Sequence, residues 1–207
     1  MKKSFFIAFE GIDGSGKTTQ IFELAKYLFR KNKKNNILLT REPYKDERIR
    51  ELLTKDKDPY KNSEKLANLF IEDRRIHLKE LILPSLKKGI HVISDRFSFS
   101  TLAYQQAQGI PLSTLIKMHK GIIIPDAIFI IDVPVEVALR RIKKDKERNR
   151  EIKFEKDIDF LKRIRENYLK LAFLPKHKVF VIDGNRKKEE VFEEIKMIIH
   201  RNFFFFE

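Results

Sequence analysis

The residues best suited to chemistry lie in a glycine-rich segment near the start of the chain. The whole chain has seven glycines, and three of them fall within six positions of this segment. Gly11–Thr18 reads G-I-D-G-S-G-K-T. The pattern G-x-x-x-x-G-K-[ST] is typical of a loop whose backbone N–H groups bind phosphate oxygens. We expect Lys17 to contact the β- and γ-phosphates of a nucleotide, and the Thr18 hydroxyl to ligate Mg²⁺. The predicted phosphate-binding residues are Gly11, Ile12, Asp13, Gly14, Ser15, Gly16, Lys17, Thr18 and Thr19.

Three further charged residues add metal and phosphate chemistry. Asp95 and Arg96 directly follow the apolar segment Ile90–Ser94. The carboxylate of Asp95 can hold Mg²⁺, directly or through water, and the guanidinium of Arg96 matches two oxygens of a second phosphate. The alternative for these two residues is a surface ion pair at the end of a strand, which the glycine-rich loop makes the weaker interpretation. Asp13 lies inside the glycine-rich loop, where a carboxylate beside phosphates either has a partner or faces solvent.

The segments that must position these residues alternate between two kinds. Short apolar-rich segments with β-branched or aromatic residues are typical of buried parallel strands, and longer segments of helical period lie between them. This alternation predicts an α/β, three-layer P-loop fold in which a five-stranded parallel sheet is flanked by helices. The predicted strands are Phe5–Phe9, Asn36–Thr40, Ile90–Ser94, Ala127–Val133 and Lys178–Ile182. The predicted helices are Lys17–Arg30, Ser63–Lys88, Thr101–Ala107, Leu112–Lys120, Val135–Lys146, Lys156–Phe173 and Lys188–His200.

Composition narrows the class of protein. The chain has 207 residues, with 44 Lys and Arg against 30 Asp and Glu, and a formal net charge of +14. Cysteine is absent, which excludes disulfides, thiolate zinc sites and thiol catalysis. No apolar run reaches the ~18 residues of a membrane helix, so we expect a cytoplasmic globular protein with no membrane partner. The charge permits nucleic-acid binding, but it suits an enzyme with polyanionic ligands equally well.

Other classes of P-loop protein fit this sequence less well. A GTPase would carry N-K-x-D after a strand, whereas Asn32–Asn35 reads N-K-K-N and precedes one. A nucleic-acid-stimulated ATPase would carry an Asp-Glu pair after its third strand and a basic groove interleaved with aromatic residues. The sequence has neither feature, so we expect no nucleic-acid partner.

Further motifs follow the glycine-rich loop in order along nearly the whole chain. Phe9–Gln20 reads F-E-G-I-D-G-S-G-K-T-T-Q, and Phe70–Arg74 reads F-I-E-D-R. Asp95–Phe97 reads D-R-F and is followed by S-T-L-A-Y-Q at Ser100–Gln105. Together these motifs resemble those of the thymidylate (dTMP) kinase family, within the nucleoside-monophosphate kinases. The other segments similar to that family are Thr40–Pro43, Pro125–Asp126 with Ile128–Val133, Phe154–Glu155 and Arg163–Leu169.

The resemblance implies an acceptor site built from two predicted helices. Phe70 would stack on thymine and Arg74 would hydrogen-bond a carbonyl of the base; four positions apart, they share one helix face. Thr101 or Gln105 would contact the pyrimidine edge, and Tyr104 would lie against the sugar at C2′. The predicted dTMP-binding residues are Asp13, Arg41, Phe70, Arg74, Arg96, Ser100, Thr101, Tyr104 and Gln105.

The resemblance also implies a basic lid over the transferred phosphate. Arg140–Arg150 holds seven basic residues in eleven. Some family members carry a catalytic arginine at the position of Gly14, so here the lid is expected to supply it, from Arg148 or Arg150. Arg141 stands where the family packs an arginine on adenine, and Asp13 would meet the 3′-hydroxyl of the acceptor or the metal. The predicted catalytic residues are Lys17, Arg96, Arg148, Arg150 and Asp13; the predicted metal ligands are Thr18 and Asp95.

One segment departs from the family pattern. Where the family often reads R-E-P-G-G-T, residues 41–46 read R-E-P-Y-K-D, which leaves Arg41, Arg48 and Arg50 as candidates for the acceptor phosphate. We predict a single kinase domain over residues 1–207, with the lid at about 140–155, that uses ATP and Mg²⁺ to phosphorylate dTMP as a homodimer. The alternatives are a relative that prefers dUMP or another deoxynucleotide and, more remotely, a nucleic-acid-stimulated ATPase.

Overall fold

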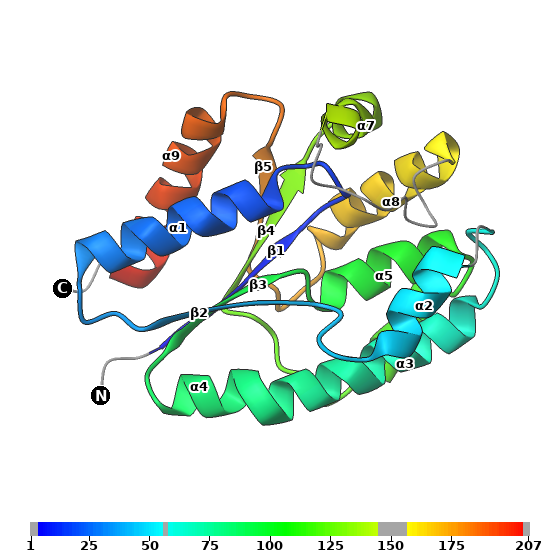
Figure 1. The fold of residues 1–207 in the computed structure, drawn as a ribbon, viewed down its shortest axis with the longest axis horizontal. Coiled ribbons are helices and arrows are strands. Elements are labelled where there is room, and N and C mark those ends of the chain that lie inside the picture. The colour runs from blue at the N-terminus through cyan, green and yellow to red at the C-terminus, as the bar shows by residue number, and fades with distance from the viewer. Residues whose placement is uncertain (1–3, 56–57, 145–156, 205–207) are drawn as a thin grey trace.

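A computed structural model describes residues 4–55, 58–144 and 157–204. Its centre is one parallel sheet with the strand order β2-β3-β1-β4-β5 (Figure 1). The predicted fold class is confirmed, but four of the five strands begin and end one residue later than the apolar pattern indicated. The strands are β1 (Phe6–Glu10), β2 (Ile37–Arg41), β3 (His91–Asp95), β4 (Ala127–Asp132) and β5 (Val179–Asp183).

Helices cover both faces of the sheet (Figure 1). The segment predicted as one helix over Ser63–Lys88 is α3, a π-helical turn and α4 in succession, and α5 begins three residues before its predicted start. The helix α2 and the C-terminal π-helical turn were not predicted. The α-helices are α1 (Lys17–Lys31), α2 (Glu47–Lys55), α3 (Ser63–His77), α4 (Leu83–Lys87), α5 (Ser98–Ala107), α6 (Leu112–Met118), α7 (Val135–Lys144), α8 (Ile158–Leu171) and α9 (Lys188–Ile199). The π-helical turns are η1 (Leu78–Ile82) and η2 (His200–Phe204).

Strand β1 is buried on both faces, which explains its continuous apolar run. Ile7 and Phe9 belong to the core cluster that also contains residues of α1 and α9. Phe6 and Ala8 belong to the opposite cluster, with residues of α5 and α8. Because burying such a side chain contributes about 1.5–3 kcal/mol, the carboxyl end of β1, where the glycine-rich loop begins, is held firmly from both sides.

The C-terminal phenylalanine segment packs in part against the body of the protein. The Phe203 ring lies 5.0 Å from that of Phe5, and Phe203 joins the core cluster on the α1–α9 side. This contact gives one of the four consecutive phenylalanines a structural role. Within the described residues, no helix combines the length and apolar character needed to cross a membrane.

Candidate active site

The glycine-rich loop curls around the amino end of α1. Lys17 is buried, and its Nζ donates to the carbonyl oxygens of Gly11 at 3.2 Å and Ile12 at 3.0 Å. Burial, assisted by the nearby Arg96 guanidinium, lowers the pKa of Lys17 to about 8. The loop needs glycine at position 14, because φ is +77° there and an added Cβ would lie 2.4 Å from the carbonyl oxygen of Ala138 on α7.

Oxygen atoms suited to a hard cation lie beside this loop. The Thr18 hydroxyl donates to Asp95 Oδ2 at 3.0 Å, which joins the first turn of α1 to the carboxyl end of β3. Mg²⁺ prefers oxygen ligands and usually keeps several waters and phosphate oxygens, so one hydroxyl and one carboxylate are a sufficient protein contribution. The described residues contain no group of three acidic, His or Cys side chains that could hold a metal, which agrees with such a sparse site.

Arg96 lies at the centre of the site, and its guanidinium donates to four side chains. One guanidinium nitrogen, Nη2, donates to Asp13 Oδ1 at 2.6 Å and to the Tyr104 hydroxyl at 3.3 Å. The other, Nη1, donates to Ser100 Oγ at 2.9 Å and to the Tyr168 hydroxyl at 3.1 Å. Burial raises the pKa of Tyr104 to about 12, so this hydroxyl stays protonated. The charge of Arg96 is therefore fixed at the edge of the glycine-rich loop.

A buried carboxylate supports this arrangement from below. Glu10, the last residue of β1, accepts from the Phe97 backbone N–H at 2.8 Å, from Ser100 Oγ at 2.6 Å and from the Tyr168 hydroxyl at 3.2 Å. Burial raises its pKa. Glu10 therefore fixes the first turn of α5 and two partners of Arg96, Ser100 and Tyr168. Neither Glu10 nor Tyr168 was predicted as a site residue; an acidic residue closing a buried apolar strand was the available signal for Glu10.

Arg74 organises a second, buried polar cluster. Its Nε and Nη2 donate to Glu42 Oε2 at 2.8 and 2.5 Å. Nη2 also donates to the Phe97 carbonyl at 3.0 Å and to Thr101 Oγ1 at 3.1 Å, while Nη1 lies 2.9 Å from His119 Nε2. Burial and the Arg74 charge lower the pKa of His119 to about 3, so its ring is neutral and accepts this hydrogen bond.

A cavity of about 930 Å³ connects the two clusters. It is lined by residues of the glycine-rich loop and by all nine residues predicted from the sequence to bind the acceptor. α2, which was not predicted, contributes Arg50, Leu53 and Thr54 to its wall. The lining residues predicted from the sequence are Asp13, Gly14, Gly16, Lys17, Thr18, Thr19, Arg41, Phe70, Arg74, Asp95, Arg96, Ser100, Thr101, Tyr104, Gln105 and Arg141.

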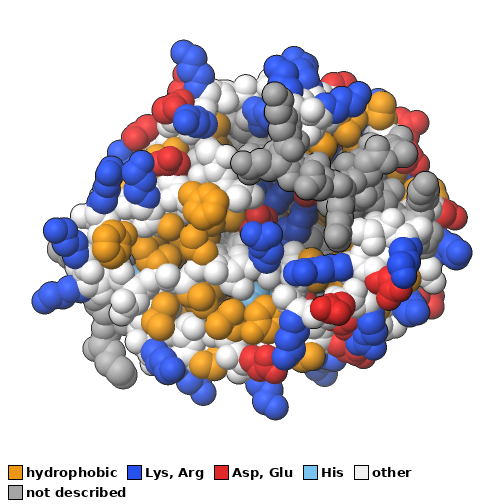
Figure 2. All heavy atoms as spheres, in the orientation of Figure 1, with side chains coloured by type: hydrophobic (Ala, Val, Ile, Leu, Met, Phe, Trp, Pro, Cys, Tyr) orange, Lys and Arg blue, Asp and Glu red, His pale blue; other side chains and the backbone are white. Residues whose placement is uncertain are grey.

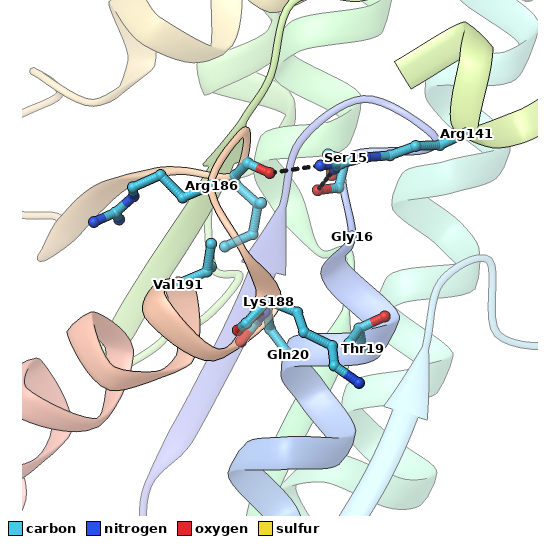
Figure 3. Close-up of a pocket in the computed structure, with 10 residues that line it drawn as sticks. Ser15, Gly16, Thr19, Gln20, Arg141, Arg186, Lys188 and Val191 are labelled. Carbon is cyan, nitrogen blue, oxygen red and sulfur yellow. Dashed lines mark hydrogen bonds between the residues drawn. The ribbon is translucent and has the colours of Figure 1, made fainter. Parts of the chain in front are cut away.

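A smaller cavity of about 260 Å³ lies on the other side of the loop. Arg141 bounds one end, where Nη1 donates to the Ser15 carbonyl at 3.1 Å and Nη2 to the Gly184 carbonyl at 2.9 Å (Figure 3). Gln20 and Lys188 bound the other end (Figure 3). The cavity is next to the phosphate loop, as a site for a nucleotide base would be.

Comparison with known proteins agrees with this geometry. The family model described as thymidylate kinase matches residues 9–195. The chain is 44% identical over 202 residues to the thymidylate kinase of Thermosipho melanesiensis, which covers 94% of this chain and 96% of the relative. It is 44% identical to the thymidylate kinase of Wolbachia pipientis over 205 residues, 95% of this chain and 96% of the relative. The chain belongs to the thymidylate kinase family.

The arginines predicted for the acceptor phosphate and for the lid lie in different places. Arg48 was a candidate for the acceptor phosphate, but it pairs with Asp46 and Glu72 and lies outside the lining of the large cavity. Arg41 and Arg50 do line it. The expected lid arginines, Arg148 and Arg150, lie outside the described residues.

Proposed function

We propose that this member of the thymidylate kinase family transfers the γ-phosphoryl group of ATP to dTMP, with the residues of the large cavity in the roles given below. The observation that carries the proposal is the cavity itself. It joins Lys17 and Thr18 of the phosphate loop to Phe70, Arg74 and the other residues expected around a pyrimidine. Both reactants would therefore share one continuous cavity, which positioning for transfer requires.

The transfer needs no dedicated base. An oxygen of the dTMP phosphate, ionised at neutral pH, attacks the γ-phosphorus of ATP while the bond to the β–γ bridging oxygen breaks, which gives dTDP and ADP. Such a reaction is accelerated chiefly by alignment and by positive charge around the moving group. Lys17 supplies that charge from the loop, and Arg96 supplies it from the side of the acceptor.

Arg96 is the residue placed to bridge the two substrates. Its guanidinium lies over the Tyr104 ring, 5.3 Å from the centroid, and is ion-paired with Asp13 at 2.6 Å. Because Arg96 is fixed by four side chains before any substrate binds, it loses little further freedom on binding. Tyr104, neutral and buried, would lie against the sugar of the acceptor.

Mg²⁺ would be held by Thr18 and Asp95, together with phosphate oxygens and water. The existing hydrogen bond between the two side chains supports this assignment, because it brings both oxygens to the same point beside the loop. When bound, the ion would neutralise charge on the phosphates of ATP.

The same mechanism predicts that the lid supplies a catalytic arginine. Gly14 is in close contact with α7, so the loop has no room for an arginine at this position unless α7 moves. This supports an arginine from the lid, with Arg148 and Arg150 as the candidates. Replacing either by alanine, or both in a double variant, should lower kcat about 10³-fold with little change in KM. Near-normal turnover in all three variants would refute this part.

A coupled assay of ADP release tests the proposed function. The enzyme should turn over dTMP faster than dUMP, dCMP, dGMP or thymidine. Arg41→Ala should raise KM for dTMP, because Arg41 lines the cavity, whereas Arg48→Ala should leave it unchanged. Preference for dUMP would point to the alternative acceptor. ATP hydrolysis stimulated by DNA or RNA would indicate the ATPase alternative.

We also propose a homodimer and a cytoplasmic location. Large apolar side chains are exposed on α1, at Phe22 and Phe29, and on α3 and α4, at Ile76 and Leu83. Hydrophobic side chains gather on the face that carries α1 and α4 (Figure 2). Such a surface supports self-association, which sedimentation equilibrium would measure. The absence of cysteine from the sequence supports a reducing compartment.

A further inference from the structure

A chain of side-chain amides runs from the loop before α3 into the acceptor cavity. Gln108, the residue that caps α5, donates through Nε2 to the backbone carbonyl of Pro59. Gln105 Nε2 in turn donates to Gln108 Oε1 at 3.0 Å. Both side chains are buried, Gln105 completely. Gln105 lines the large cavity, and its Oε1 is buried without a hydrogen-bond partner in the described structure.

The direction of this chain is fixed by chemistry at its outer end. A backbone carbonyl only accepts hydrogen bonds, so the nitrogen of the Gln108 amide must face Pro59 and its oxygen must face Gln105. That oxygen also only accepts, so the nitrogen of the Gln105 amide must face Gln108. The remaining polar atom of Gln105 is then its oxygen, an acceptor, and an unpaired buried acceptor favours a ligand that donates to it.

Pyrimidine bases differ in what they offer at this point. Thymine and uracil carry a donor, N3–H, between two carbonyl oxygens, whereas cytosine carries an unprotonated N3 acceptor beside its 4-amino donor. An acceptor on Gln105 therefore suits the N3–H of thymine and uracil and repels N3 of cytosine. Arg74, which only donates, suits a carbonyl and opposes the 4-amino group.

We propose that Gln108, anchored on the Pro59 carbonyl, is a positioning residue that fixes the Gln105 amide with its oxygen toward the base and thereby excludes cytosine nucleotides. The proposal rests on dTMP as the acceptor and names a determinant of that choice. Gln108 acts through Gln105 and does not line the cavity itself. When Gln108 lacks its acceptor oxygen, the Gln105 amide is free to rotate by half a turn and offer a donor to N3 of cytosine.

The test compares kcat/KM for dTMP, dUMP and dCMP in variants at position 108. Gln108→Met keeps the length of the side chain and removes the acceptor, so the preference for dTMP over dCMP should fall about tenfold or more. The ratio of dTMP to dUMP should stay constant, because both bases carry N3–H. Gln108→Glu keeps an acceptor toward Gln105 and should retain the discrimination against dCMP even if its melting temperature is lower.

The matched control is Gln106→Met on the same helix. Gln106 donates to Asn167 Oδ1 at 2.8 Å and is not part of the chain of amides from Pro59 to Gln105. Its variant should therefore keep both the dTMP to dCMP and the dTMP to dUMP ratio. An unchanged dTMP to dCMP ratio in Gln108→Met, or an equal loss for all three acceptors, would overturn the proposal. If Gln108→Met does not fold, loss of discrimination in Gln108→Glu would overturn it. A wild-type enzyme that does not phosphorylate dTMP would refute the proposed function instead.

Discussion

Glu42 anchors the acceptor half of the cavity, and its replacement gives the sharpest test of that half. The side chains of Glu42 and Arg74 are 4% and 1% exposed. Oε2 of Glu42 accepts two hydrogen bonds from Arg74, and Oε1 lies 3.2 Å from His77 Nδ1. Because arginine stays protonated at any working pH, neutralising Glu42 leaves a buried guanidinium without its counter-charge.

The expected cost follows from this geometry. Removing one partner of a buried ion pair costs about 3–5 kcal/mol of unfolding free energy. Two hydrogen bonds to charged groups, at about 1.5–3 kcal/mol each, give an overlapping range of about 3–6 kcal/mol. For a domain of this size, 1 kcal/mol corresponds to about 2–4 °C, so Glu42→Gln should lower Tm by about 6–20 °C. Binding of dTMP should weaken as well, because Arg74 loses the partner that orients it.

A double-mutant cycle separates coupling from general damage. Glu42→Gln, Arg74→Gln and the double variant should be unfolded in urea and followed by circular dichroism, since the chain has no tryptophan. The double variant should be more stable than the sum of the single losses predicts, by about 2 kcal/mol, yet should not recover dTMP binding. Glu80→Gln is the matched control: Glu80 pairs with Lys45 on the surface, where an ion pair contributes about 0–1 kcal/mol. A coupling energy between Glu42 and Arg74 below about 0.5 kcal/mol, or equal losses of stability in Glu42→Gln and Glu80→Gln, would refute the reasoning.

Three further perturbations test separate parts of the structure. Gly14→Ala should lower stability and kcat/KM for ATP more than Gly89→Ala in parallel melts and kinetics, because both glycines have similar positive φ but only a Cβ at position 14 would meet backbone, at Ala138. The pKa of Lys17 is about 8, so at pH 8.5 most Lys17 side chains are neutral in the free enzyme. Bound phosphates raise this pKa, so ATP binding at pH 8.5 should take up more than half of a proton. Calorimetry in buffers of different ionisation enthalpy should measure this proton uptake, and Lys17→Arg should abolish it. The lowered pKa of His119, about 3, means that the unfolded chain binds a proton below pH ~6.5 that the folded chain does not. The free energy of unfolding should therefore decrease as the pH is lowered, by at most about 1.4 kcal/mol per pH unit for this group. Urea titrations from pH 7 to pH 5 should show a smaller decrease in His119→Gln than in the wild type.

The sheet could be predicted almost to the residue, and the error in four of the five strands has one cause. In the structure each strand ends on a charged residue: Glu10, Arg41, Asp95, Asp132 and Asp183. In all strands but β4, the apolar pattern marks the buried apolar part and stops before this residue, whereas backbone pairing continues through it; for β4 the prediction ran one residue too far, to Val133. Of the residues that the pattern left out, Arg41 and Asp95 line the large cavity and Glu10 supports it from below.

The parts that could not be predicted depend on contacts between distant segments. α2 has nine residues, and its apolar residues Ile49, Leu52 and Leu53 span little more than one helical turn, which is too short a window for periodicity to identify a helix. Arg74 and Glu42 are 32 positions apart, and Glu10 and Tyr168 are 158 apart. No local spacing encodes such pairs. The motifs predicted Arg74 as a site residue but not Tyr168, and only the folded chain shows the partner of each.

The strand order has a consequence for how the enzyme can change. β1 occupies the centre of the sheet, with β3 and β2 on one side and β4 and β5 on the other. In the proposed arrangement, the side chains around the acceptor pyrimidine come from segments that follow β2 and β3, whereas the smaller cavity is lined by segments that follow β1, β4 and β5. The loop after β1 and Arg141 of α7 line both cavities. A new acceptor preference can therefore arise through substitutions in one half of the sequence, while the other half continues to bind the phosphate donor.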